Sequence, residues 1–232
     1  MQKLRINGGH SLKGELVISG SKNAALPIMA ACLLCPNEIQ IENVPNLRDI
    51  KTMGLLLSHM GATIEKGTEN TIKINAKNIN QKFAPYDLVK TMRASIVVLG
   101  PLLARFGEAI VSLPGGCSIG ARPVNLHIEG LSAMGAKIEI KNGYIHAVAS
   151  ELKGCDFEFN PVSVTGTANL MMAASLAKGK TILNNSAKEP EIVNISAVPN
   201  SPPPSQQFMP VGQQFIPAGQ QFVPVSHQSV SY

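Results

Sequence analysis

Charged residues are missing from the last part of this 232-residue sequence. Residues 195–232 contain no Asp, Glu, Lys or Arg, although they hold seven of the 16 prolines. The whole net charge of +5 therefore belongs to residues 1–194. This asymmetry excludes one uniform globular domain over the full length. We expect a folded domain over residues 1–194 and a Pro/Gln-rich low-complexity tail over residues 195–232.

Aromatic residues and long apolar runs are also scarce. Tryptophan is absent, and only six of the ten Phe and Tyr residues lie in residues 1–194. Stacking platforms for nucleic acids are therefore few, and the dispersed positive charge suits small anionic ligands better than a duplex. No apolar run reaches the roughly 18 residues of a membrane-spanning helix, and no secretory signal is recognisable. We expect no nucleic-acid partner and no membrane partner.

Four cysteines are too few and too scattered for a disulfide scaffold. They are Cys32, Cys35, Cys117 and Cys155. Cys32 and Cys35 have the spacing of a redox motif, but they lie in the apolar run AALPIMAACLLC without a second CxxC. We interpret them as buried helix thiols rather than as a metal or redox site. Few, scattered cysteines favour a reducing, cytoplasmic location, and we expect no cofactor and no metal.

An internal repeat organises residues 1–194. Met60-Gly61-Ala62 and Met134-Gly135-Ala136 each end an amphipathic helix and precede two alternating strands joined by a polar turn. Apolar helices are predicted at 21–34, 90–107 and 165–180, each followed by a strand. The repeating unit of roughly seventy residues reads helix, strand, helix, strand, turn, strand, which predicts an α/β fold. The third unit is incomplete, because the prolines after residue 195 bar the second helix expected after 189–194.

A seven-residue repeat fills the tail with the copies SQQFMPV, GQQFIPA and GQQFVPV. Proline in each copy rules out a coiled coil and predicts extended, polyproline-like disorder. The break inside a structural unit favours a truncated or fused reading frame. The alternative is a ligand segment for a Pro-recognising partner, in which case the chain would act as an adaptor.

The loop LPGGCSIGARPVNLH, residues 113–127, is the most unusual stretch. Arg122 lies five residues after Cys117, and a nearby cation lowers the pKa of a thiol. Cys117 is therefore a candidate reactive thiol, although an incidental surface cysteine fits the residues equally well. His127 has two interpretations, a partner of Cys117 or a structural residue at a helix start, and we favour the second.

Each apolar helix opens with residues suited to binding an anion. Lys22 stands beside Ser21 and Asn23, which can cap the first helix, and Arg93 opens the second. The third opening, Ser163 to Thr167, offers hydroxyls and backbone N–H groups. Three such openings at equivalent positions predict helix N-termini that converge on one anionic ligand. Alternatively, the capping residues recur only because they stabilise each helix.

These residues resemble the enolpyruvyl transferase family. The resemblance rests on SGSKNAALPIMAA, RDIKTM, LVKTMRASIVVLGPLLARFGEA, LPGGCSIGARPVNLH, VTGTANLMMAASLAKG and EPEIVN, and it is colinear over residues 1–194. It implies a cytoplasmic enzyme that transfers enolpyruvate from phosphoenolpyruvate to the 3-hydroxyl of UDP-N-acetylglucosamine, the first committed step of peptidoglycan synthesis. The implied fold is an inside-out α/β barrel domain of βαβαββ units. The chain covers roughly the first half of a family member.

The resemblance also implies roles for single residues. Cys117 matches the proton-donating cysteine that fosfomycin alkylates. Phosphoenolpyruvate would be bound by Lys22, Asn23 and Arg122. UDP-N-acetylglucosamine would be bound by Arg93, Arg122, Pro123, Val124, Asn125, Leu126, Ser163 and Val164. A thiol can protonate an enol carbon near neutral pH, and arginine forks suit phosphate and carboxylate groups.

The sequence departs from the family pattern at several places. Asn125 replaces a usual Asp, Pro161 a Lys of some members, Ala168 a frequent Glu and Lys188 a frequent Arg. Nothing after Asn194 matches the family's second domain, which supplies the aspartate proposed as general base. The resemblance thus predicts a fragment with little or no activity of its own. The alternatives to such an enzyme fragment are a non-catalytic remnant that binds UDP-sugars and an adaptor that acts through its Pro/Gln-rich tail.

Overall fold

The structure is a computed structural model that describes residues 3–5, 7–9, 13–16, 18–114 and 124–196, and the backbone of 208–210. The helices are α1 (Lys22–Ala31), η1 (Cys32–Leu34), α2 (Arg48–His59), α3 (Tyr86–Val89), η2 (Arg93–Val98), α4 (Leu99–Phe106), α5 (Asn125–Ala133), α6 (Val164–Ala174) and α7 (Pro190–Ser196). The strands are β1 (Glu38–Glu42), β2 (Thr63–Lys66), β3 (Ile72–Asn75), β4 (Phe83–Ala84), β5 (Glu108–Ser112), β6 (Lys137–Lys141), β7 (Tyr144–Val148), β8 (Asp156–Glu158), β9 (Ile182–Asn184) and β10 (Phe208–Pro210).

The repeat predicted from the sequence is present as two matching sheets. β1 pairs antiparallel with β3, which pairs antiparallel with β2, and the second unit repeats this arrangement with β5, β7 and β6. In the second and third units, the strand that leads into the apolar helix lies parallel to the strand that follows it, as β4 lies beside β5 and β8 beside β9. The predicted α/β fold of repeated units is therefore confirmed.

Both Met-Gly-Ala turns end a helix in the same way. Gly61 and Gly135 have φ values of 106° and 93°, in the left-handed region that glycine tolerates. The following alanines close each turn: the Ala62 N–H donates to the Leu57 carbonyl at 3.0 Å, and the Ala136 N–H repeats this bond one unit later. These caps direct the chain from α2 into β2 and from α5 into β6.

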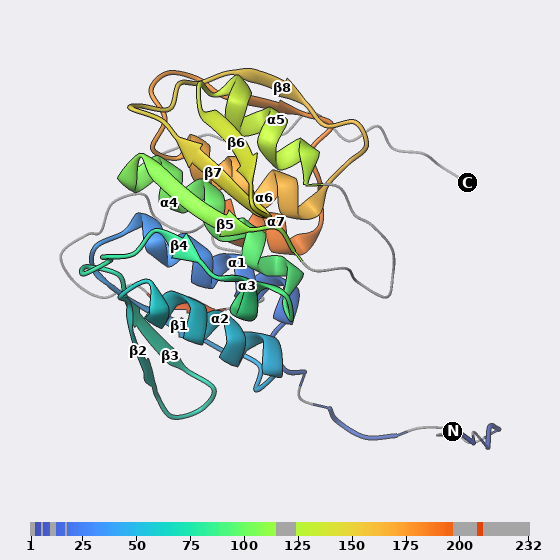
Figure 1. The fold of residues 1–232 in the computed structure, drawn as a ribbon. Helices are drawn as coiled ribbons and strands as arrows, with labels where there is room; N and C mark the ends of the chain where they lie inside the picture. Colours follow the sequence, from blue (N-terminus) through green and yellow to red (C-terminus); the bar gives the residue numbers. More distant parts are fainter. Residues whose placement is uncertain are drawn as a thin grey trace, which may run out of the picture.

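The apolar helices form the centre of the core. Most residues of α1 and α6, and the first five of α4, are buried. The helices α1 and α6 contact each other and η2, and α4 contacts α6. Figure 1 shows α1, α6 and α7 in the middle of the body, with β2 and β3 at one end and β8 at the other. Helices of all three units thus share one core.

The second apolar helix differs from the prediction in its opening. The segment predicted as one helix over 90–107 begins with the 3-10 helix η2, and α-helical geometry starts only at Leu99. Pro101 explains the break, because proline lacks an N–H and its ring clashes with the carbonyl four residues earlier, here that of Val97.

The third unit contains a short second helix where none was predicted. Helix α7 begins at Pro190 and packs against α1 and α6 with Ile192 and Ile195 buried. Proline suits the first position of a helix, where its missing N–H has no intrahelical partner to lose. The helix was expected after residues 189–194, where the prolines would bar it; it begins earlier, at Pro190, and lies before them. The described residues after α7 contain no hairpin of the kind that completes the first two units.

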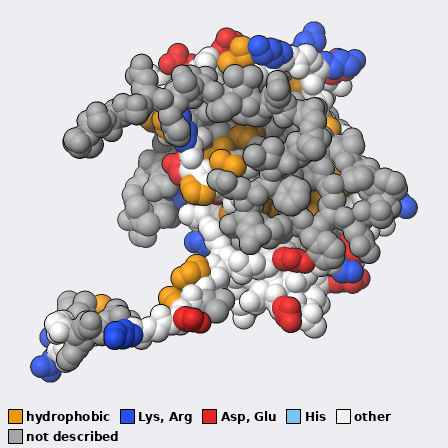
Figure 2. Space-filling model, turned by 180° about the vertical axis from the view of Figure 1, so that it is seen from behind, with side chains coloured by type: hydrophobic (Ala, Val, Ile, Leu, Met, Phe, Trp, Pro, Cys, Tyr) orange, Lys and Arg blue, Asp and Glu red, His pale blue; other side chains and the backbone are white. Residues whose placement is uncertain are grey.

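The two ends of the chain differ in how much the structure describes. The N-terminal segment projects from the body, as Figures 1 and 2 show, with Leu4, Leu16 and Ile18 at 72–89% exposed. Of the tail, the structure describes Ile195 and Ser196 at the end of α7 and the backbone of β10, which lies parallel to β1. The tail's predicted disorder otherwise concerns residues outside the described part. The domain boundary after Asn194 stays a prediction.

Arg105 ties the second unit to the first. Its Nη1 donates to the carbonyl oxygens of Leu33 at 2.7 Å, Ala76 at 3.0 Å and Cys35 at 3.4 Å. The Leu33 and Cys35 carbonyls lie at the end of η1, so one guanidinium satisfies groups that the helix leaves unpaired.

Arg105→Met keeps an unbranched, apolar side chain but removes these donors. We expect the free energy of unfolding to fall by about 2–3 kcal/mol, since hydrogen bonds to charged groups contribute about 1.5–3 kcal/mol. Urea titration measures the change. Arg48→Met, at the exposed first position of α2, is the control and should change stability by less than about 0.5 kcal/mol. Equal effects of the two substitutions would contradict the bridging role of Arg105.

Candidate functional site

Lys22 and Asn23 open α1 as the sequence predicts. Ser21 is the N-cap, and its Oγ accepts the Ala24 N–H at 3.4 Å. The Lys22 Nζ lies 2.9 Å from Asp49 Oδ2, with the two side chains 42% and 32% exposed. The first turn of α1 therefore presents a cation that is held by a carboxylate of α2 and is accessible to solvent.

Asp49 is a site residue that the sequence analysis missed. It lies in the first turn of α2, where a carboxylate is favoured by the helix dipole. The motif RDIKTM contains it, but its partner stands 27 residues earlier. The sequence shows only that an acidic residue opens α2; the packing of α1 against α2 is what brings it to Lys22.

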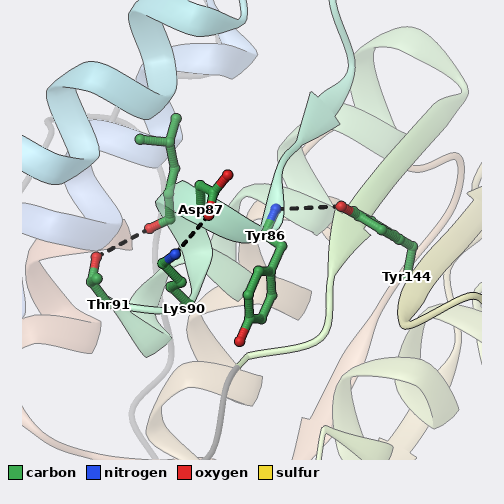
Figure 3. Close-up of polar contacts among 6 residues, drawn as sticks. Tyr86, Asp87, Lys90, Thr91 and Tyr144 are labelled. Carbon is green, nitrogen blue, oxygen red and sulfur yellow. Dashed lines mark hydrogen bonds and ion pairs between the residues drawn. The ribbon is translucent and has the colours of Figure 1, made fainter.

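Arg93 opens η2, half-buried, directly after the short helix α3. Figure 3 shows the contacts that hold α3 in place. Lys90 Nζ lies 2.6 Å from Asp87 Oδ1, which raises the pKa of Lys90, and the Tyr86 N–H donates to the Tyr144 hydroxyl of β7 at 3.4 Å. The second opening is therefore anchored to its own sheet.

Thr91 does not act as a helix cap. Its hydroxyl donates to the Leu88 carbonyl at 3.4 Å, which closes α3, and η2 begins after Met92 without a side-chain cap. The second opening thus differs from the first and third, which begin behind capping serines.

The start of α5 carries three predicted nucleotide-site residues. Val124 is the N-cap, and Asn125 and Leu126 are the first two helical residues. Asn125 is exposed and its Nδ2 donates to Glu129 Oε1 at 3.2 Å, whereas Leu126 is buried. An Asp at position 125, usual in the family, could not donate this bond. The amide therefore fits the neighbouring carboxylate.

The start of α6 follows the prediction closely. Ser163 is the N-cap, and its Oγ accepts the Gly166 N–H at 3.1 Å. Ser163 and Val164 are half-buried and Thr165 is exposed. A capped helix start with accessible side chains is suited to an anionic group, because backbone N–H groups and the helix dipole both favour negative charge there.

His127 is a buried structural residue in the first turn of α5, as expected. Only 3% of it is exposed, and burial lowers its pKa to about 4. Its Nδ1 lies 2.9 Å from Asn169 Nδ2, and its Nε2 lies 3.3 Å from Thr165 Oγ1. Both ring nitrogens are engaged by α6, which argues against the alternative of a Cys117 partner.

The remaining predicted residues fall into two groups. Cys117, Arg122 and Pro123 lie outside the described residues, so the predictions for them stay predictions. Cys32 and Cys35 are buried free thiols, and burial raises the pKa of Cys32 to about 12. An unreactive helix thiol is the consequence, as predicted.

The described part of the chain contains neither a candidate metal site nor a candidate membrane-spanning helix. Its His, Cys, Asp and Glu side chains form no group of three or more that could hold a metal ion. Among the same residues, no helix combines the length and apolar character that a membrane crossing requires.

The described side chains predicted to bind substrate stand at the starts of α1, η2, α5 and α6. Except for Leu126, the described side chains predicted to bind substrate are at least partly exposed. Two neighbouring starts are linked in each half of the body, α1 to α2 by Lys22 and Asp49, and α5 to α6 by His127 and Thr165. Paired helix starts with cations and hydroxyls are suited to a ligand with several anionic groups. The convergence of all openings on one ligand remains a prediction.

The family pattern and the most similar relatives of this chain point to the same family. The pattern of the EPSP synthase (3-phosphoshikimate 1-carboxyvinyltransferase) family matches residues 6–198. A protein of Trichlorobacter lovleyi named UDP-N-acetylglucosamine 1-carboxyvinyltransferase is 57% identical over 84% of this chain and 47% of its own length. One of the same name from Cellvibrio japonicus is 58% identical over the same shares. The chain spans about half the length of the curated relatives it matches.

Solved structures agree on the fold. The enolpyruvyl transferase NikO from Streptomyces tendae superposes with a TM-score of 0.70 at 20% identity, covering 90% of this chain and 53% of that chain. An EPSP synthase from Acinetobacter baumannii gives a TM-score of 0.63 at 17% identity over 81% of this chain and 44% of that chain. At such low identity the similarity concerns the fold alone.

Proposed function

The chain belongs to the enolpyruvyl transferase family, and from this membership we propose that it is the substrate-binding part of a UDP-N-acetylglucosamine 1-carboxyvinyltransferase. The observation that carries the proposal is the identity of 54–58% with relatives of that name. The reaction joins the sugar 3-hydroxyl oxygen to the enolpyruvyl group of phosphoenolpyruvate and releases inorganic phosphate. Its place would be the first committed step of peptidoglycan synthesis, in the cytoplasm.

The site residues divide by the chemistry of the two substrates. Lys22 and Asn23 at the start of α1, with Arg122, would hold the phosphate and carboxylate of phosphoenolpyruvate. Arg93 and the helix starts at Val124–Leu126 and Ser163–Val164, with Arg122 and Pro123, would hold the nucleotide. Helix starts and fixed cations already point toward the position of the negative charge, so they need no reorganisation when the substrate binds. Such preorganised groups are the main source of charge stabilisation in sites of this kind.

Cys117 would supply the proton for the enol carbon. Protonation of that carbon makes its neighbour electrophilic, so that the sugar hydroxyl oxygen can add to it. A thiol titrates close enough to neutral pH to donate a proton, and the cation of Arg122 five residues later would lower the pKa of the thiol. The same nucleophilic sulfur would make Cys117 the point of alkylation by fosfomycin.

Turnover by this chain alone is not expected. Its relatives are about twice as long, and the family's hydroxyl-activating aspartate has no counterpart in the 232 residues. Catalysis depends on positioning both substrates together, and half of a closed site loses most of that effect. Binding of UDP-N-acetylglucosamine without turnover is the expected behaviour.

The test is to incubate the purified chain with both substrates and measure phosphate release, with thermal stabilisation by UDP-N-acetylglucosamine as a second readout. Fosfomycin-treated protein and Cys117→Ser are run in parallel. Ligand stabilisation without phosphate release supports the proposal. Phosphate release that fosfomycin and Cys117→Ser abolish would overturn the expected inactivity, and the absence of stabilisation would overturn the proposed substrate.

Asp49→Asn tests the cation site at α1. Removing the carboxylate leaves the Lys22 ammonium without its 2.9 Å partner, so we expect inorganic phosphate to bind about three- to fivefold more tightly at low salt, in line with the small energy of exposed ion pairs. Isothermal titration measures the change. High ionic strength should shrink it, since exposed charges are screened.

The matched control is Asp87→Asn, which breaks the pair of Asp87 with Lys90 in α3. This control should leave phosphate affinity unchanged. Weaker phosphate binding in Asp49→Asn would contradict competition between Asp49 and the anion, and would mean that Asp49 orients Lys22 for binding.

A further inference from the structure

A chain of hydrogen bonds connects three helices behind the predicted nucleotide site. The Gly100 N–H of α4 donates to Asn169 Oδ1 at 2.7 Å. The Asn169 side chain in α6 lies 2.9 Å from His127 Nδ1 in α5, and the other ring nitrogen of His127 lies 3.3 Å from Thr165 Oγ1. Asn169 is 0% exposed and His127 3% exposed, so the two bonds made by the Asn169 side chain lie away from water, whereas the bond to Thr165 is only partly buried.

The first bond of the chain fixes the direction of the others. A backbone N–H can only donate, so the Asn169 oxygen faces Gly100 and its amide nitrogen faces His127. His127 Nδ1 must then accept, which leaves a neutral ring with its proton on Nε2. That proton is donated to Thr165 Oγ1. The Thr165 hydroxyl oxygen thereby accepts this proton, so the hydroxyl's own proton is directed away from His127.

Thr165 stands at the surface end of this chain of bonds. It is the exposed second residue of α6, directly after Ser163 and Val164. Asn169 lies one turn further into the same helix and is completely buried. The orientation set at Gly100 is therefore transmitted from the core to a hydroxyl at the capped start of α6.

We propose that His127 is a positioning residue of the nucleotide site, which acts by orienting the Thr165 hydroxyl as a donor to the diphosphate of the ligand. The inference rests on the proposed function, because it takes the start of α6 as the diphosphate end of the site. It adds Thr165 as a residue that contacts the diphosphate directly. His127 and Asn169 are added as the residues that orient the proton of the Thr165 hydroxyl.

Two substitutions of His127 separate this role from a purely structural one. Gln places an amide where Nε2 lies and can still donate to Thr165, whereas Asn places its amide where Nδ1 lies and keeps only the contact with Asn169. Each loses one of the two hydrogen bonds of His127, so we expect the two variants to have similar melting temperatures. A structural role predicts equal ligand affinity, whereas the positioning role predicts different affinities.

The measurement is isothermal titration of the full chain with UDP-N-acetylglucosamine and, separately, with inorganic pyrophosphate. We expect His127→Gln to bind like the unmodified chain and His127→Asn to bind about five- to tenfold more weakly, the effect of one lost hydrogen bond. Thr165→Val should show the same loss. The double variant His127→Asn/Thr165→Val should lose no more than either single variant, because both remove one interaction.

The outcomes distinguish the positioning role of His127 from the proposed function of the chain. If UDP-N-acetylglucosamine binds but the Gln and Asn variants are equal, or the losses add, the positioning role is overturned and the proposed function stands. If only pyrophosphate binds and shows the expected pattern, the positioning role stands and the proposed substrate is wrong. If neither ligand binds the unmodified chain, both are overturned.

Discussion

Replacing Gly100 with alanine is expected to lower the free energy of unfolding by about 3 kcal/mol, at the upper end of the usual cost of overpacking. A Cβ at this position would lie 2.4 Å from the Asn169 backbone oxygen and 2.6 Å from its Oδ1. The backbone of α6 cannot yield as a flexible side chain would, so α4 and α6 must separate. Chemical denaturation followed by circular dichroism measures the loss.

Gly54→Ala is the matched control. Gly54 also lies inside a helix, but a Cβ there would meet only Ile64 Cδ1, at 3.6 Å, an ordinary van der Waals distance. This substitution should stabilise the protein by about 0.5–1 kcal/mol, because alanine has less backbone entropy to lose in a helix. Similar stability changes at both positions would show that helix propensity, and not the close approach of α4 and α6, governs Gly100.

Acid is expected to remove about 2–3 kcal/mol of stability between pH 7 and pH 4.5 through His127 alone. Burial lowers the pKa of His127 from 6.5 to about 4 in the folded chain. The unfolded chain therefore binds this proton first as the pH falls. The stabilisation is complete above pH 6.5 and is lost progressively toward pH 4. Protonation would also place a second donor against the Asn169 amide, since Nδ1 accepts in the neutral ring.

His127→Gln isolates this contribution, because its side chain does not titrate. Carboxylates near their ordinary pKa values titrate alike in both proteins and cancel in the difference. The stability of the unmodified chain minus that of the variant, measured by urea titration at several pH values, should decrease by about 2–3 kcal/mol from pH 7 to pH 4.5. A difference independent of pH would mean that the folded chain holds the protonated ring without cost.

Local sequence signals predicted the repeated units well. The Met-Gly-Ala turns depend on one glycine that can adopt positive φ, and Gly61 and Gly135 do so. The serine caps depend on a hydroxyl three residues before a free N–H, and Ser21 and Ser163 occupy such positions. Such signals act within a few residues, so the sequence displays them directly.

The contacts that build the site act over longer distances. Lys22 and Asp49 are 27 residues apart, and His127 and Thr165 are 38 residues apart. Nothing in the sequence near either residue specifies the partner, because helix packing brings them together. The start of helix α7 was not predicted for a different reason: proline usually ends helices, but Pro190 stands at the first helical position, where a helix tolerates proline best.

The shared helical core has a consequence for how the chain folds. Repeats in solenoid proteins contact only their neighbours and can unfold one at a time. Here Arg105 of the second unit holds carbonyls of the first, and Asn169 of the third unit holds the Gly100 N–H of the second. No unit keeps its buried groups satisfied without the others. Amide hydrogens of α1, α4 and α6 should therefore exchange with solvent through one common opening of the whole domain rather than in separate steps.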